Sequence, residues 1–152
     1  MGKIKKFQLN WRDAWGIPQE GYHSTLETGE DGKTTIGILV NMEPFRINPE
    51  GREDALIRGI KNSGIEKISG YYYDAVNVLD GDQWSIDIIA DDLNVYAAGH
   101  CTFPHEFEHL LEFLHKEWHL PICKIARRYY HKKINEQDRY GERRKLKEEY
   151  RF

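Results

Sequence analysis

The chain contains few cysteines, and this scarcity limits its compartment and its chemistry. Only two of the 152 residues are cysteine, Cys101 and Cys123. Two such residues form no disulfide framework, and a reducing compartment is the usual setting for a chain of this kind. We therefore expect a cytoplasmic protein whose fold does not depend on disulfide bonds.

Long hydrophobic runs and well-known nucleotide or hydrolase motifs are also missing. No stretch approaches the roughly 20 apolar residues of a membrane span, and the basic start of the chain leads into no apolar segment of a secretory signal. There is no P-loop, no glycine-rich dinucleotide turn, no Gly-x-Ser-x-Gly elbow and no Cys-x-x-Cys. We expect no membrane partner and none of these common enzyme classes.

The residues that are present are typical of one water-soluble domain with a substantial core. Hydrophobic residues make up 39% of the chain, aromatic residues 12% and charged residues 31%. Residues 120–152 carry eleven Lys or Arg and five Asp or Glu, whereas the rest of the chain is strongly acidic. We therefore divide the chain into an α+β core domain, residues 1–120, and a basic helical C-terminal extension of the same domain, residues 121–152.

Hydrophobic periodicity and turn residues predict an α+β fold with a mainly antiparallel sheet of about five or six strands. Helices pack on one face of this sheet in the predicted arrangement. The first strand is predicted to be short and is a candidate edge strand, and Pro44 and Pro49 are predicted to bound a loop. The predicted elements are strand 4–9, hairpin 22–28 with 33–42, helix 49–62, hairpin 68–79 with 83–90 across Asp80-Gly81-Asp82, strand 93–98 and helix 104–119.

The most suggestive motif is His-Glu-Phe-Glu-His, residues 105–109, at the start of the last predicted core helix. In metallopeptidases an H-E-x-x-H pair of histidines binds zinc and the glutamate activates a bound water molecule. Under this hypothesis His105 and His109 are metal ligands and Glu106 is the catalytic base. A non-catalytic zinc site with Cys101, His105 and His109 (or His100) as ligands is a related possibility.

The helical pattern around the motif favours a plainer interpretation. Phe107, Leu110 and Leu114 belong to one apolar stripe, and the two motif histidines lie on the opposite side of the same helix. The glycine of the longer zinc-peptidase pattern is replaced by Glu112, so the helix should continue straight. We therefore expect the motif histidines to face water, with no cofactor bound.

Basic and aromatic residues alternate in the C-terminal extension and suggest contact with an anionic partner. Arg127, Arg128, Lys132 and Lys133 flank aromatic side chains, a pattern that can hold phosphates and stack bases. The overall acidity of the chain, with a net charge of −3, argues against a dedicated nucleic-acid binder. The same helix can instead cover apolar surface or meet the acidic core.

These patterns favour a non-enzymatic binding or protein-interaction module whose partner is another protein or a second copy of the chain. We expect its contacts to come from an aromatic loop holding Trp11 and Trp15, or from the C-terminal helix. A zinc-dependent hydrolase and a nucleic-acid binder are the two alternatives. The sequence leaves the substrate and the partner open.

Overall fold

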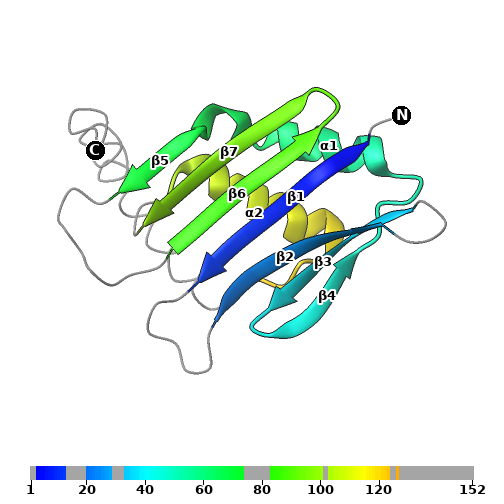
Figure 1. The fold of residues 1–152 in the computed structure, drawn as a ribbon, viewed down its shortest axis with the longest axis horizontal. Coiled ribbons are helices and arrows are strands. Elements are labelled where there is room, and N and C mark those ends of the chain that lie inside the picture. The colour runs from blue at the N-terminus through cyan, green and yellow to red at the C-terminus, as the bar shows by residue number, and fades with distance from the viewer. Residues whose placement is uncertain are drawn as a thin grey trace.

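In the computed structural model, the described residues form one curved sheet of seven strands, and two α-helices cover one face of this sheet (Figure 1). The structure describes residues 3–12, 20–28, 33–73, 83–100, 103–123 and 126. The elements are β1 (Ile4–Arg12), β2 (Gly21–Thr28), β3 (Thr34–Val40), β4 (Glu43–Ile47), α1 (Glu53–Asn62), the 3₁₀ helix η1 (Ile65–Ile68), β5 (Gly70–Tyr73), β6 (Gln83–Ala90), β7 (Leu93–His100) and α2 (His105–Trp118).

The strand order is β4-β3-β2-β1-β6-β7-β5, and every neighbouring pair is antiparallel except β5 with β7. The predicted α+β class and the antiparallel character of the sheet are confirmed. The described part of the chain contains seven strands rather than five or six, and the sheet is mixed. Of the predicted extension, residues 121–152, only 121–123 and 126 are described, so its helical character stays a prediction.

Alternation along the strands explains why one face of the sheet is covered. Phe7, Leu9 and Trp11 of β1 are buried beneath the helices, and the residues between them point to the other face. The same alternation buries Ile36, Ile38 and Val40 of β3 and Trp84, Ile86 and Ile88 of β6. Helices α1 and α2 lie together behind the sheet in Figure 1, so the apolar core fills the space between the two layers.

Strand β1 is central rather than the short edge strand that its sequence predicts. It pairs with β2 on one side and with β6 on the other, and it continues to Arg12. Its interrupted alternation arises from a β-bulge, because the register against β6 shifts between Ile4 and Lys6. The bulge allows Ile4 and Phe7 both to face the core although they are three positions apart.

Strand β4 lies where the sequence predicts a loop. The chain turns through Asn41 and Met42, which have φ values of 52° and 70°, and returns as β4 along β3. Two successive residues in the left-handed region define the tight hairpin turn that suits twisted strands. Pro44 is accommodated because β4 is an edge strand, where a missing N–H removes no bond to a neighbour.

The predicted hairpin of residues 68–79 with residues 83–90 is wrong. β5 pairs in parallel with β7, with Tyr71 opposite Ala98, and β7 separates β5 from β6. The predicted turn at Asp80-Gly81-Asp82 lies outside the described residues. β6 and β7 pair directly across a turn at Asp91-Asp92.

Both predicted core helices are present. α1 begins at Glu53, later than predicted, and buries Leu56, Ile57 and Ile60. α2 begins at His105, because Pro104 occupies the N-cap position with extended backbone, and it buries the predicted apolar stripe from Phe107 to Trp118. Within the described residues, no helix has the length and apolar character needed to cross a bilayer.

Candidate functional site

The open face of the sheet is the side opposite the helices, and one register row crosses it from edge to edge. The pairings connect Pro44 to Leu39, Leu39 to His23, His23 to Asn10, Asn10 to Ser85, Ser85 to Ala98 and Ala98 to Tyr71. All seven strands therefore contribute one residue to this row. It is apolar at the β4–β3 end, polar in the middle and aromatic at the β5 end.

A groove of 910 Å³ lies along this row. Its lining includes Leu39 and Met42 at one end, Tyr71 at the other, and Asn10 and Ser85 between them. Short side chains form the middle of the floor, whereas larger side chains rise at both ends. We refer to this feature as the open-face groove.

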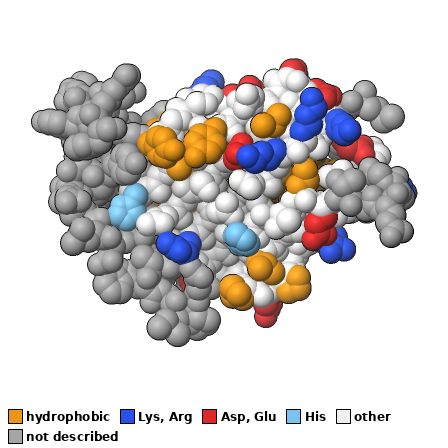
Figure 2. All heavy atoms as spheres, in the orientation of Figure 1, with side chains coloured by type: hydrophobic (Ala, Val, Ile, Leu, Met, Phe, Trp, Pro, Cys, Tyr) orange, Lys and Arg blue, Asp and Glu red, His pale blue; other side chains and the backbone are white. Residues whose placement is uncertain are grey.

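Large exposed hydrophobic side chains gather beside this groove. Met42 is 63% exposed, and Tyr71 and Tyr96 are each 49% exposed. In Figure 2 hydrophobic side chains gather over β5 and β7 and again near β3 and β4, with histidine between these two areas, and other hydrophobic side chains lie elsewhere on the face. The large hydrophobic side chains that the described residues leave exposed therefore lie at the two ends of the groove.

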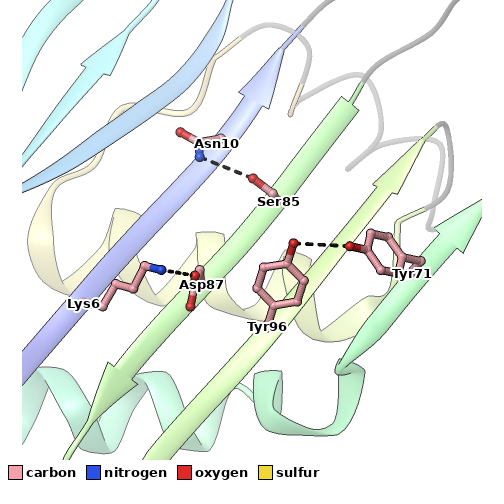
Figure 3. Close-up of polar contacts among 6 residues, drawn as sticks. All are labelled: Lys6, Asn10, Tyr71, Ser85, Asp87 and Tyr96. Carbon is pink, nitrogen blue, oxygen red and sulfur yellow. Dashed lines mark hydrogen bonds and ion pairs between the residues drawn. The ribbon is translucent and has the colours of Figure 1, made fainter.

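The two tyrosines support each other at the β5 end of the groove. Their rings meet edge to face with centroids 6.2 Å apart, and their hydroxyl oxygens are 3.3 Å apart (Figure 3). The hydrogen bond to Tyr71 raises the pKa of Tyr96 above the usual tyrosine value, so the Tyr96 phenol keeps its proton at neutral pH. The pair presents a firm aromatic surface with hydroxyl groups at its edge.

Asn10 organises the polar middle of the groove. Its amide nitrogen donates to Ser85 Oγ at 3.3 Å (Figure 3), and its carbonyl oxygen accepts the N–H of Ser24 at 3.4 Å. The buried Ser24 hydroxyl accepts the N–H of Leu9 at 2.5 Å. These side chains join β1 to β2 beyond the last backbone pair at Asn10–His23, so they hold the groove floor together.

The charges on the open face are largely neutralised within the face. Lys6 pairs with Asp87 at 2.5 Å (Figure 3), and Arg46 pairs with Glu27 at 3.3 Å. Arg12 is different, because its guanidinium donates to the neutral amide oxygen of Gln83 at 3.0 Å. Within the part of the chain that the structure describes, this side chain bonds to a neutral amide rather than to a carboxylate.

Glu20, which bears a carboxylate, also lies on the rim of the groove. Its negative charge contributes to the raised pKa of Cys123, although burial is the main cause. Cys123 is buried, on the helix side of the sheet, next to the core residue Tyr22. Arg12 is the one Lys or Arg, and Glu20 the one Asp or Glu, among the described residues that line the groove.

An aromatic cluster packs behind the groove and fixes its position. Phe107 of α2 lies between Trp11 and Trp84, with ring centroids 5.0 Å and 4.9 Å away, and Phe103 stacks on Trp11 at 4.5 Å. Gly99 is needed here, because a Cβ at that position would lie 2.4 Å from the indole nitrogen of Trp84. The first turn of α2 therefore supports the sheet from below the groove.

The prediction that Trp11 belongs to an exposed aromatic contact loop is wrong. Its side chain is 3% exposed and belongs to this cluster. Alternation places Trp11 on the core face of β1, where its large apolar surface is better buried than left in water. Trp15 lies outside the described residues.

The His-Glu-Phe-Glu-His segment has its apolar side on the sheet, as predicted. His109 is exposed and His105 is half-buried at the first position of α2. Glu106 is also half-buried and leans on η1, where its Cγ lies 3.4 Å from the place of a Cβ on Gly64. Cys101 lies outside the described residues.

The described side chains at this helix start do not by themselves form a metal site. Among the residues that the structure describes, no group of three His, Cys, Asp or Glu side chains could hold one metal ion. A site at His105 and His109 would have to take a third donor from elsewhere, for example Cys101. The zinc site and the role of Glu106 stay predictions, for which elemental analysis of the purified protein with His109→Ala as comparison is the test.

The remaining predicted contact residues cannot be placed. Arg127, Arg128, Lys132 and Lys133 all lie outside the described residues. The start of the extension is anchored, however, because Tyr22 donates to the carbonyl of Pro121 at 2.9 Å and accepts the N–H of Cys123 at 3.0 Å. Residues 121–123 are thereby tied to β2.

No protein-family model, curated protein or solved structure matches the chain. The candidate site therefore rests on its own geometry.

Sequence reasoning missed the groove residues Arg12, His23, Met42 and Tyr71, and it also missed Tyr96, which packs against Tyr71. Alternation along each strand does reveal the outward positions, and it assigns Ser85 and Asp87 to the solvent side correctly. The strand order is what joins the outward residues into one row, and β5 pairs with a strand more than twenty positions later in the chain. The available signal for this site was the pair of exposed tyrosines, Tyr71 in one predicted strand and Tyr96 in another.

Proposed function

We propose that this protein is a non-enzymatic binding module that holds a protein partner on the open face of its sheet. One observation carries the proposal. The three large hydrophobic side chains that the described residues leave most exposed, Met42, Tyr71 and Tyr96, all border the open-face groove or contact a residue that does. Exposed apolar and aromatic side chains at the ends of one groove are typical of an interaction site.

The backbone at Met42 supports this interpretation independently. Its φ of 70° lies in the left-handed region, which glycine and asparagine adopt with little strain and methionine does not. A strained position occupied by an exposed methionine does not benefit folding. Such strain is typical of positions where the side chain serves a contact. Methionine also adapts its shape readily to a partner surface.

The spacing of the histidines favours binding over catalysis. His23 is on β2 and His100 is on β7, so two strands separate them. With strands about 4.8 Å apart and about 3.4 Å per residue along a strand, their Cα atoms are roughly 15 Å apart. Two imidazoles at that separation do not act together as acid and base on one reacting group.

The distribution of charge favours a protein over a nucleic acid at this face. Neutralising a phosphate backbone requires several free cations, whereas Lys6 and Arg46 are already paired with carboxylates. Tyrosine, methionine and arginine around a polar floor are the residues enriched in protein interfaces. The face therefore suits a partner with both apolar and polar side chains.

Site-specific photo-crosslinking tests the proposal. A photoreactive phenylalanine replaces Tyr96 on the open face in one variant and Glu117, exposed on α2, in the control variant. After illumination in the native cell, we expect one protein to be crosslinked from position 96 and not from position 117. Adding Tyr71→Ser should abolish that product. Equal products from both positions, or none from position 96, would show that the open face is not the binding surface.

A further inference from the structure

The length of the open-face groove limits what kind of ligand can occupy it. From Leu39 on β3 to Tyr71 on β5 the register row crosses five strand-to-strand steps. At about 4.8 Å per step the two ends are roughly 24 Å apart. A small metabolite cannot touch both ends, whereas an extended peptide reaches that far with about seven residues at about 3.3 Å each.

The chemistry of the two ends calls for apolar side chains. Leu39 and the strained Met42 border one end, and the tyrosine pair forms the other. The floor between them is made of Asn10 and Ser85, which offer amide and hydroxyl groups to a peptide backbone. A peptide fits these surfaces if it has an apolar side chain at each end and backbone groups between them that can bond to the polar floor.

The charge over the groove calls for an acid in the middle of the occupant. Arg12 and Gln83 belong to the register row beside the floor row, since Arg12 pairs with Gln83 and Gln83 pairs with His100. The guanidinium is held over this row by its bond to Gln83, which leaves other N–H donors of the fork for a ligand. A carboxylate is the natural partner for an arginine fork.

We propose that the partner contributes an extended segment of about seven residues, with an apolar side chain at each end and an Asp or Glu between them that pairs with Arg12. This proposal rests on the proposed function, because it names the chemistry of the partner at the same face. The segment lies across the strands rather than adding a strand at an edge of the sheet.

Selection from a phage-displayed library of random 12-residue peptides on the full-length protein tests the proposal. We expect the enriched peptides to share two apolar residues about six positions apart with an acidic residue between them. Selection on Arg12→Glu should enrich Lys or Arg at that middle position instead. No enrichment on the unsubstituted protein, or enriched peptides without a shared acid, would overturn the proposal.

A matched pair of variants measures the contribution of the charge. Arg12→Gln should weaken binding of an enriched peptide about tenfold in titrations, because it removes a charge-assisted hydrogen bond at the rim. Arg58→Gln removes the same charge from the exposed surface of α1 and should leave the affinity unchanged. Equal affinities for all three proteins would overturn the pairing with Arg12.

The two proposals fail in different ways. Crosslinking from position 96 combined with peptides that lack an acid would retain the open face as the binding surface and reject the acidic segment. Strong, salt-dependent binding of an oligonucleotide that is lost in Arg12→Gln would reject the peptide and point to a nucleic acid. Both arginines are exposed, so thermal unfolding of the two variants should match that of the unsubstituted protein and exclude misfolding.

Discussion

At the scale of single residues, Met42 combines an unfavourable backbone with an exposed side chain at the end of the groove. Its neighbour Asn41 occupies the same region of φ but has a structural reason to do so, because its side-chain oxygen accepts the N–H of Gly21 at 2.9 Å. Asparagine adopts this conformation readily, and methionine does not. The two turn residues should therefore respond to substitution in opposite directions.

We expect Met42→Gly to raise the free energy of unfolding by about 1 kcal/mol, since it relieves the strain of a left-handed residue. The same substitution should weaken partner binding, because it removes an apolar side chain from the groove. Asn41→Gly is the matched control and should lower stability by about 1 kcal/mol, through loss of its hydrogen bond to Gly21. Chemical denaturation measures both values, and a destabilised Met42→Gly variant would contradict the argument.

The buried thiol of Cys123 gives a prediction about pH. Burial raises the pKa of Cys123 above the usual value near 9, so the folded protein keeps the thiol proton more firmly than the unfolded chain does. The stability contributed by the neutral thiol is present below the unfolded pKa and is lost as pH rises through the higher folded value. Stability should therefore decline above about pH 9 in the native protein.

Cys123→Ala should lessen this alkaline decline, although it will also cost some packing energy at neutral pH. The measurement is the free energy of unfolding between pH 8 and pH 10.5 for both proteins. A thiol reagent should also modify Cys123 slowly until the protein unfolds, because the side chain is buried. Equal alkaline slopes for the two proteins would contradict the role of the thiol.

At the scale of elements, the two helices are joined where Phe113 of α2 lies over Gly59 of α1. A Cβ at Gly59 would be 1.9 Å from the Phe113 ring, so the helices approach through the missing side chain. Helix propensity alone predicts that Gly59→Ala stabilises α1 by about 1 kcal/mol. The steric overlap opposes this gain and is larger, at about 1–3 kcal/mol.

We therefore expect Gly59→Ala to lower the melting temperature rather than raise it. In the background of Phe113→Ala the ring is absent, and there the same Gly59→Ala change should be neutral or stabilising. A thermal unfolding series of the four proteins forms a double-mutant cycle that isolates the contact. Stabilisation by Gly59→Ala in the unsubstituted protein would show that the helices separate easily.

The sequence predicted the elements better than it predicted their pairing, and the reasons are physical. The apolar stripe of α2 and the alternation in β3 and β6 are local signals, and they were read correctly. β4 was missed because Pro44 is a turn signal along the chain but is tolerated at a sheet edge. β5 was paired wrongly because an Asp-Gly turn predicts a hairpin, whereas its true partner β7 follows β6.

At the scale of the whole molecule, the sheet is assembled by pairing strands that are distant in the chain. Trp11 of β1 pairs with Trp84 of β6, so the centre of the sheet forms only when the two halves of the chain meet. Such pairing costs loop entropy before it yields contacts. We expect refolding on the millisecond-to-second timescale, followed by stopped-flow tryptophan fluorescence after dilution from denaturant.

Trp118→Phe is the control for that experiment, since it removes the tryptophan of α2 and leaves those of the sheet centre. A dominant microsecond phase in this variant would contradict late closure of β1 against β6. The same long-range order explains why the candidate site was hidden from sequence reasoning. Each of the seven strands adds one residue to the register row along which the groove lies, and the order of the strands in the sheet does not follow their order in the chain.

The proline of β4 has a consequence for how the protein behaves in a crowded solution. In the two-residue hairpin the closing pair Val40–Glu43 is hydrogen-bonded, so Pro44 and Arg46 direct their backbone groups away from β3. Pro44 has no N–H to donate, and Arg46 bears a charged side chain. A neighbouring molecule can add a strand there only poorly, so this margin of the sheet is protected against the edge-to-edge growth that leads to aggregates and fibres.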